Sequence, residues 1–220
     1  MNRKIATLIL LMLLTAPWAG AKSLDTRISK LQFFGMDNSL VFEIHLFYDV
    51  KGNVVKSKEF DPYMRLVGME EFVFNEKGVW TEEKLINSRR QLEKHTIIDY
   101  AEGKRIRKTY DRDYVLLMVT EDEYGSKGEI KSVTEYSVTG GNKGDVLSLS
   151  KYSYTGAGEI KCARSDRVSA WDYYYIIKLS EQGQIESVSY YNTSGQKTGF
   201  VKIVLEEGVM TPQSLNLIIY

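Results

Sequence analysis

Residues 48–54 read YDVKGNV, and this stretch predicts a tight β-hairpin. A three-residue loop over positions 50–52 places Gly52 last, where the backbone needs a positive φ that glycine adopts without strain. Tyr48 then faces Val54 across the two strands. An aromatic residue opposite a β-branched one stabilises an antiparallel pair by roughly 0.2–1 kcal/mol. The stretch therefore contains both a turn and the side-chain pair that fixes the register of its strands.

The same pattern recurs along the chain about every 25 residues, which is the signature of a repeat architecture. Its turn glycines are Gly52, Gly78, Gly103, Gly128, Gly158, Gly183 and Gly208. A large apolar or aromatic residue stands four positions before most of these glycines, at Tyr48, Phe74, Tyr124, Tyr154, Leu179 and Val204. Another stands two positions after, at Val54, Trp80, Ile130, Ile160, Ile185 and Met210. At Gly103 the frame slips by one, and we expect Tyr100 to pair with Ile106.

A period of this length accommodates two strands and two turns. We therefore expect about 14 strands in one antiparallel meander, a single all-β domain over residues 22–220 that forms a curved or curled sheet. Turns at the opposite end of the hairpins are expected at Asp61-Pro62, Arg112-Asp113, Gly140–Gly144, Ser165–Arg167 and Asn192–Gly195.

One segment, Thr81 to His95, departs from this uniformity. Leu85, Ile86 and Leu92 lie at helical spacing among good helix formers, which favours a short helix near 81–95. The 25-residue spacing continues through the segment, however, and favours a strand pair with a charged turn. Both interpretations stay open on the sequence.

The amino terminus has the pattern of a secretory signal. Asn2-Arg3-Lys4 is followed by an apolar run from Ile5 to Leu14, by Pro17, and by the small residues Ala19-Gly20-Ala21. The run is too short for a membrane-spanning helix of ~20 residues. We expect cleavage after Ala21 and export to the periplasm or the extracellular space.

The overall composition excludes several classes of protein. The chain has 29 basic and 29 acidic residues, a balance that a general nucleic-acid binder does not show. Its single cysteine, Cys162, can form no internal disulfide, and we expect it to be a buried apolar residue.

The YDVKGNV turn resembles the bacterial YD or Rhs-type repeat and, more loosely, MORN-like hairpin repeats. These families alternate an aromatic-Asp strand end, a glycine turn and an apolar strand start. Only the first unit here has Tyr-Asp at the expected place, since the others begin with Phe74-Asn75, Tyr124-Gly125, Tyr154-Thr155 or Leu179-Ser180. The resemblance implies successive hairpins in an exported or surface protein, and no catalytic residues.

A meander of this length behind an export signal also suits an outer-membrane barrel. Such a barrel needs one uncharged face on each strand. In residues 54–60, 80–86 and 105–110 the alternation places charged residues on both faces, for example Lys58 and Glu59 in the first of these segments. Membrane insertion is therefore not expected.

No residues at catalytic or metal-binding spacing stand out. His45 and His95 have no acidic or cysteine ligand at zinc spacing, and the clusters Asp111–Asp113 and Glu121–Glu123 lack the pattern of a calcium loop. No cofactor is expected. The most suggestive feature is an aromatic cluster, interpreted either as ordinary cross-strand packing or as a binding platform, at Tyr152, Tyr154, Trp171, Tyr173, Tyr174, Tyr175, Tyr190 and Tyr191.

These observations lead to one main hypothesis and two alternatives. The main hypothesis is a non-catalytic binding or scaffold module of the bacterial cell envelope, with an envelope protein, a saccharide or a lipid as partner and no nucleic acid. The first alternative is a periplasmic carrier that holds a lipophilic ligand in an open half-barrel. The second is an outer-membrane β-barrel. An unrecognised enzyme is the last interpretation.

Overall fold

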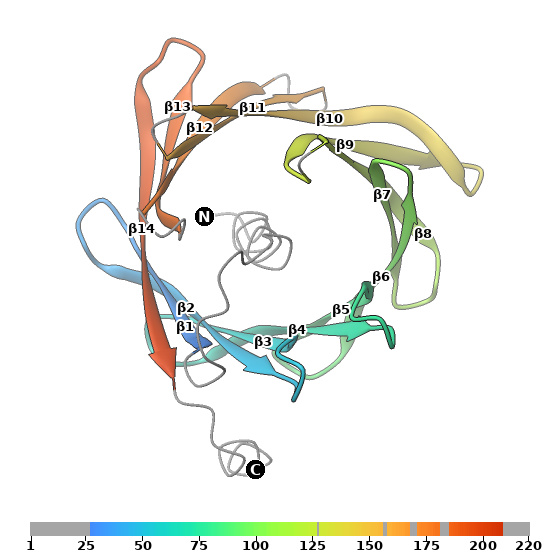
Figure 1. Cartoon of the computed structure of the whole chain (residues 1–220), viewed down its shortest axis with the longest axis horizontal. Helices are drawn as coiled ribbons and strands as arrows, with labels where there is room; N and C mark the ends of the chain where they lie inside the picture. The colour runs from blue at the N-terminus through green and yellow to red at the C-terminus, as the bar shows by residue number, and fades with distance from the viewer. Residues whose placement is uncertain (1–26, 127, 156–157, 168–170, 181–184, 209–220) are drawn as a thin grey trace.

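The protein is an all-β barrel, seen in a computed structural model that describes residues 27–126, 128–155, 158–167, 171–180 and 185–208 (Figure 1). The predicted leader, residues 1–21, and Gly183 lie outside these ranges. The described residues form 14 strands: β1 (Arg27–Phe34), β2 (Leu40–Tyr48), β3 (Val54–Phe60), β4 (Leu66–Phe74), β5 (Trp80–Asn87), β6 (Leu92–Ala101), β7 (Lys104–Asp111), β8 (Leu116–Tyr124), β9 (Ile130–Thr139), β10 (Asn142–Thr155), β11 (Glu159–Asp166), β12 (Trp171–Leu179), β13 (Ile185–Asn192) and β14 (Lys197–Gly208). No helix in these ranges is long and apolar enough to cross a membrane.

Each strand pairs antiparallel with the next, which confirms the predicted meander. The expectation of a curved or curled sheet needs one correction, because the sheet closes completely when β14 pairs with β1. Phe33 is opposite Ile203 at this seam. Figure 1 shows the resulting ring of strands down the barrel axis. Closure leaves the sheet with no free edge strand.

The YDVKGNV turn has the predicted geometry. The backbone N–H of Asp49 donates to the carbonyl of Asn53 at 2.9 Å, and Gly52 has a φ of 94°. Tyr48 pairs with Val54 as expected. The corresponding pairs are also confirmed in four other repeats: Phe74–Trp80, Tyr124–Ile130, Tyr154–Ile160 and Leu179–Ile185.

Turns at the opposite end use the same geometry with different residues. In the Asp61–Arg65 turn the Asp61 N–H donates to the Arg65 carbonyl at 3.0 Å, and Met64 takes the positive φ, 61°. The Asp61 Oδ1 atom accepts the N–H groups of Tyr63 and Arg65, both at 2.9 Å. Asn87, Asp111 and Asn192 begin turns of this kind as well. An Asp or Asn at the first position therefore holds these turns, because its side chain binds the backbone directly.

Two expectations about the turn glycines are wrong. Ala101 pairs with Lys104 around a two-residue loop, so Tyr100 faces Arg105 and Ile106 faces Asp99 on the other side of the sheet. The predicted pairing of Tyr100 with Ile106 requires a three-residue loop, and the observed loop is one residue shorter. Gly208 is not in a turn, because it ends β14 and pairs with Arg27 at the seam.

The alternative helix over 81–95 is also wrong. The segment forms β5, a turn and the start of β6. Asn87 holds the turn by accepting the N–H groups of Arg89 and Gln91 at 2.9 and 3.0 Å, and Arg90 adopts a φ of 61°. Paired strands on both sides give this segment a complete ladder of hydrogen bonds, which overrides its helix propensity.

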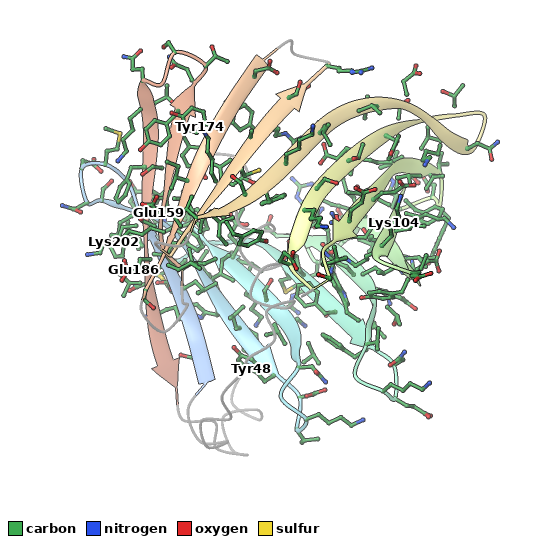
Figure 2. The ribbon with its side chains drawn as sticks, turned by 45° about the horizontal axis from the view of Figure 1, so that its top comes forward. Tyr48, Lys104, Glu159, Tyr174, Glu186 and Lys202 are labelled. Carbon is green, nitrogen blue, oxygen red and sulfur yellow. The ribbon has the colours of Figure 1, made fainter. Side chains whose placement is uncertain are left out.

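Alternation along the strands gives the barrel two distinct faces. One face carries most of the deeply buried side chains, including Leu31, Phe33, Ile177, Val188 and Val201. We call it the inner face, because side chains converge on the concave side of a closed sheet. The residues between them form the outer face. Figure 2 labels Tyr48 from the inner face and Lys104, Glu159, Tyr174 and Lys202 from the outer face.

Candidate functional site: the inner wall of the barrel

The inner wall has an apolar part that runs across the seam. Buried apolar residues form one cluster along neighbouring strands from β11 to β14 and from β1 to β6: Leu31, Phe33, Ile44, Leu46, Tyr48, Val54, Phe72, Trp80, Ile98, Ile160, Cys162, Tyr175, Ile177, Ile185, Val188, Val201 and Ile203. Each of these positions alternates with an outward-pointing neighbour, which is the two-residue period of a strand. The interior therefore has a broad apolar surface.

The predicted aromatic cluster divides between the two faces. The inner face carries Tyr152, Tyr154, Tyr173, Tyr175 and Tyr190, whereas Tyr174 and Tyr191 point outward. Trp171 begins β12, and its side chain lies outside the described part of the chain. The eight residues therefore do not form a single platform.

Two of the inner tyrosines, Tyr152 and Tyr175, flank Cys162. The hydroxyl groups of Tyr152 and Tyr175 lie 3.2 Å apart, and Cys162 is paired in register with both residues. Cys162 is fully buried, which confirms the expectation for it, and burial raises the pKa of its thiol. Burial also raises the pKa values of Tyr152 and Tyr175. A neutral thiol among neutral hydroxyl groups gives this part of the wall polar atoms without charge.

The two outward tyrosines form a small stack of their own. The rings of Tyr174 and Tyr191 are nearly parallel, with centroids 4.9 Å apart. The ammonium group of Lys161 lies 4.3 Å from the Tyr174 ring centroid. A cation over an exposed aromatic ring adds about 0.5–1 kcal/mol. The arrangement stabilises neighbouring strands on the outer face.

The opposite part of the inner wall contains a buried ionic cluster on β7 and β8. The Asp122 carboxylate is completely buried and accepts hydrogen bonds from two guanidinium groups. Arg105 Nε donates to Asp122 Oδ2 at 2.6 Å, and Arg107 Nη2 donates to Oδ1 at 2.9 Å. Burial acts to lower the pKa of Arg107, but the charge and hydrogen bond of Asp122 raise it. One carboxylate therefore serves two arginines.

Arg105 lies in an aromatic cage. Its guanidinium carbon is 5.2 Å from the Trp80 ring centroid and 5.7 Å from that of Tyr124. The hydroxyl of Tyr100 donates to the Trp80 backbone carbonyl at 2.9 Å and so links Tyr100 to the same cage. Arg105 is only 1% exposed, yet its Nη2 group has no hydrogen-bond partner among the residues that the structure describes.

Glu83 on β5, two strands from β7, interacts electrostatically with this cluster. Burial raises the pKa of its carboxyl group, against the opposing charges of Arg107, Arg105 and Lys94. Glu83 therefore interacts with both guanidinium groups through its charge, while Asp122 is the carboxylate that hydrogen-bonds them.

A second ion pair lies further round the inner wall. Arg164 Nη2 donates to Glu135 Oε2 at 2.7 Å, and the Ser148 hydroxyl donates to the same oxygen at 2.7 Å. Both charged side chains are mostly buried. Here one guanidinium group has one carboxylate, whereas two guanidinium groups share Asp122.

The sequence contained a signal for the ionic cluster that the prediction did not use. Arg105 and Arg107 belong to segment 105–110, whose charges entered the prediction from sequence only as an argument against membrane insertion. Asp122 stands two residues before Tyr124, in the repeat that follows, and the repeat register brings it opposite Arg105. The repeat spacing indicates that the two strands are neighbours, whereas the pairing of these two residues follows only from the register of β7 and β8.

The outer face carries charged side chains on most strands, many of them in cross-strand pairs. Lys56 lies 2.8 Å from Glu71, Lys104 lies 3.1 Å from Glu123, and Lys143 lies 2.6 Å from Glu121. These side chains are partly or well exposed. The predicted presence of charges on both faces of the strands is confirmed.

Both histidines contact a carboxylate on the outer face. His45 Nε2 lies 2.6 Å from Glu43 Oε1, and His95 Nε2 lies 3.0 Å from Glu82 Oε2. Within the described residues no group of three or more His, Cys, Asp and Glu side chains is arranged to hold a metal ion.

No family model and no curated protein matches the chain. Among solved structures it is similar to a porin-like protein from Bacteroides vulgatus, with 12% identity, a TM-score of 0.48, and coverage of 83% of this chain and 99% of that one. It is also similar to a porin-like protein from Bacteroides uniformis, with 9% identity, a TM-score of 0.44 and the same coverage. A third structure, TcdB2-TccC3-TEV, has a TM-score of 0.22 and 9% identity, over 82% of this chain and 14% of that one.

Proposed function

We propose that this protein is an exported β-barrel that holds a lipophilic ligand against its inner wall. The observation that supports this proposal is the contrast between the two faces of one closed sheet. The inner face presents a broad apolar and aromatic surface over β11 to β14 and β1 to β6, with two buried ionic clusters beside it, whereas the outer face presents exposed charged pairs. Closure is what favours a carrier over an open scaffold sheet, which would offer free edges to a partner strand.

The width of the barrel supports an interior that admits a ligand. Strands spaced ~4.8 Å apart and tilted by ~40° give 14 strands a circumference of about 88 Å and a backbone diameter of about 28 Å. Two facing sheets fill the space between them when they are ~10 Å apart. The side chains of the wall alone are too short to fill a barrel of this width.

The outer face supports a protein that works in water. A charged side chain at the middle of a bilayer costs roughly 2–4 kcal/mol. Lys84 on β5, Lys108 on β7 and Lys161 on β11 are all outward residues near the middle of their strands. We infer that the barrel is an envelope protein outside the bilayer, and we propose no catalytic activity for it.

The proposal is tested by expressing the full chain with its leader and releasing the periplasmic contents without detergent. Native mass spectrometry of the purified barrel should show an added mass, and organic extraction should recover a lipophilic molecule. A soluble barrel that carries nothing, and that binds no alkyl probe after purification, would refute the carrier function.

A second candidate function, the outer-membrane barrel, is favoured by closure and by an even number of antiparallel strands in one meander. Val73, Ile97 and Leu117 are also apolar side chains exposed on the outer face. This candidate predicts that the folded protein sediments with membranes and needs detergent for extraction. The same fractionation therefore separates the two functions.

A further inference from the structure

We propose that the corner formed by Arg105 and Arg107 binds the oxyanion headgroup of the ligand, a carboxylate or a phosphate ester on an apolar chain. The inference rests on the proposed carrier function and names the chemical class that the interior takes. It is supported by three features of the wall: an unsatisfied donor, the sharing of one carboxylate by two guanidinium groups, and the position of both beside the apolar surface.

The unsatisfied donor is the Nη2 group of Arg105. Arg105 is almost completely buried, and its Nε atom already binds Asp122. Within the described part of the chain Nη2 has no hydrogen-bond partner, although an unpaired buried donor is unfavourable, and more so when it is charged. The flanking rings of Trp80 and Tyr124 hold the guanidinium group from its faces but cannot accept its in-plane N–H groups. An oxyanion is the strongest acceptor for such a group.

The second feature is the sharing of Asp122. Its carboxylate is the hydrogen-bond partner of both Arg105 and Arg107, so two guanidinium groups share one acceptor. The pair of Arg164 and Glu135 elsewhere on the wall has one carboxylate for one guanidinium group. A ligand anion would supply a further acceptor at the corner of Arg105 and Arg107.

The position of the cluster suits a molecule with one charged end. Arg107 pairs with Ile98, which belongs to the continuous apolar cluster of the inner wall. Trp80 contacts Arg105 on one side and packs edge-on against Phe72, with ring centroids 5.8 Å apart, on the other. Arg107 is 15% exposed, so a headgroup would meet it first, with Arg105 behind it. The chain of the ligand would then lie along β5 and β4 toward the seam.

The test compares four probes with the same twelve-carbon chain, using delipidated full-length mature protein and isothermal titration calorimetry below the micelle concentration of each probe. Dodecanoate and dodecyl phosphate carry the proposed headgroups, dodecanol is neutral, and dodecyltrimethylammonium is cationic. We expect one or both anions to bind about tenfold or more tightly than dodecanol, because charge-assisted hydrogen bonds are the stronger class. The ratio between the two anions distinguishes a carboxylate from a phosphate ligand.

The variant Arg105→Gln should lose the preference for the anions and keep the affinity for dodecanol. Lys104→Gln, the adjacent outward residue that pairs with Glu123, is the matched control and should leave all four affinities unchanged. If Arg105→Gln weakens all probes equally, the role of Arg105 is structural and the inference is overturned. The ratio of anion to dodecanol affinity in the unmodified protein tests the headgroup site even if the variant does not fold.

Failure of the headgroup site and failure of the carrier function give different results. If dodecanol binds and the anions bind no more tightly, the headgroup site is refuted while the carrier function stands. If none of the four probes binds, the carrier function itself is refuted, and the headgroup site with it. Tightest binding of the cationic probe would contradict the sign of the charge assigned to the cluster.

Discussion

Replacement of Asp122 by asparagine should destabilise the barrel more than any other single change of charge. The Asp122 carboxylate is completely buried and accepts hydrogen bonds of 2.6, 3.1 and 2.9 Å from two guanidinium groups. Asparagine keeps the size but removes the charge, and its amide directs donors at donors. Breaking a buried ion pair from one side costs about 3–5 kcal/mol. A domain of this size loses about 2–4 °C per kcal/mol, so the Tm of Asp122→Asn should fall by roughly 6–20 °C.

The measurement is urea-induced unfolding followed by tryptophan fluorescence, with the free energy of unfolding compared at one urea concentration near the midpoints. Asp99→Asn is the matched control, because Asp99 pairs with Lys108 at 3.2 Å on the outer face and both side chains are well exposed. An exposed pair contributes ~0–1 kcal/mol. If Asp122→Asn costs no more than this control, the description of the cluster as a buried, stabilising centre is incorrect.

Three further predictions concern other parts of the barrel. Burial raises the pKa of Glu83, so the folded state binds the carboxyl proton more tightly than the unfolded state, and the free energy of unfolding falls as the pH rises above about 4.5. In parallel urea titrations Glu83→Gln should therefore be more stable than the unmodified protein near pH 7 and equally stable near pH 4. In thermal unfolding, Gly78→Ala should lower the stability by about 1 kcal/mol, because Gly78 has a φ of 76° and the added methyl group contacts no atom that could compensate. Met64 has a similar positive φ in the equivalent turn position, so Met64→Gly should be neutral or stabilising in the same assay. Cys162 should react with a maleimide only in denaturant, since the thiol is buried and its pKa raised; rapid labelling of the native protein would contradict this.

The local structure could be predicted from the sequence because its determinants are local. A glycine at the end of a three-residue loop and an aromatic–apolar pair around it fix one hairpin at a time, as the turn at Gly52 shows. The resemblance to YD- or Rhs-type repeats implies the same hairpins and stays a prediction. The predicted partner of Tyr100 was wrong because the loop has two residues in place of the expected three, and a shift of one residue moves the side chains of β7 to the opposite face of the sheet.

Closure and the candidate site could not be predicted in the same way. Whether β14 meets β1 depends on twist and tilt summed over all strands, and no short pattern encodes that sum. The tyrosine cluster was predicted from neighbourhood in sequence, but alternation placed Tyr174 and Tyr191 on the outer face. The ionic cluster was overlooked because Arg105 and Asp122 are 17 positions apart and meet only through the register of β7 and β8.

The seam between β1 and β14 also determines the order in which the barrel can form. Every other pair of neighbouring strands is consecutive in sequence, so those hairpins can form while the chain emerges in the amino-to-carboxyl direction. The seam joins Arg27 to Gly208 and must wait for the last strand. Until then β1 presents an unpaired edge, which can recruit a strand from another chain. Loss of β14 would therefore cause self-association of the exported chain rather than a smaller barrel.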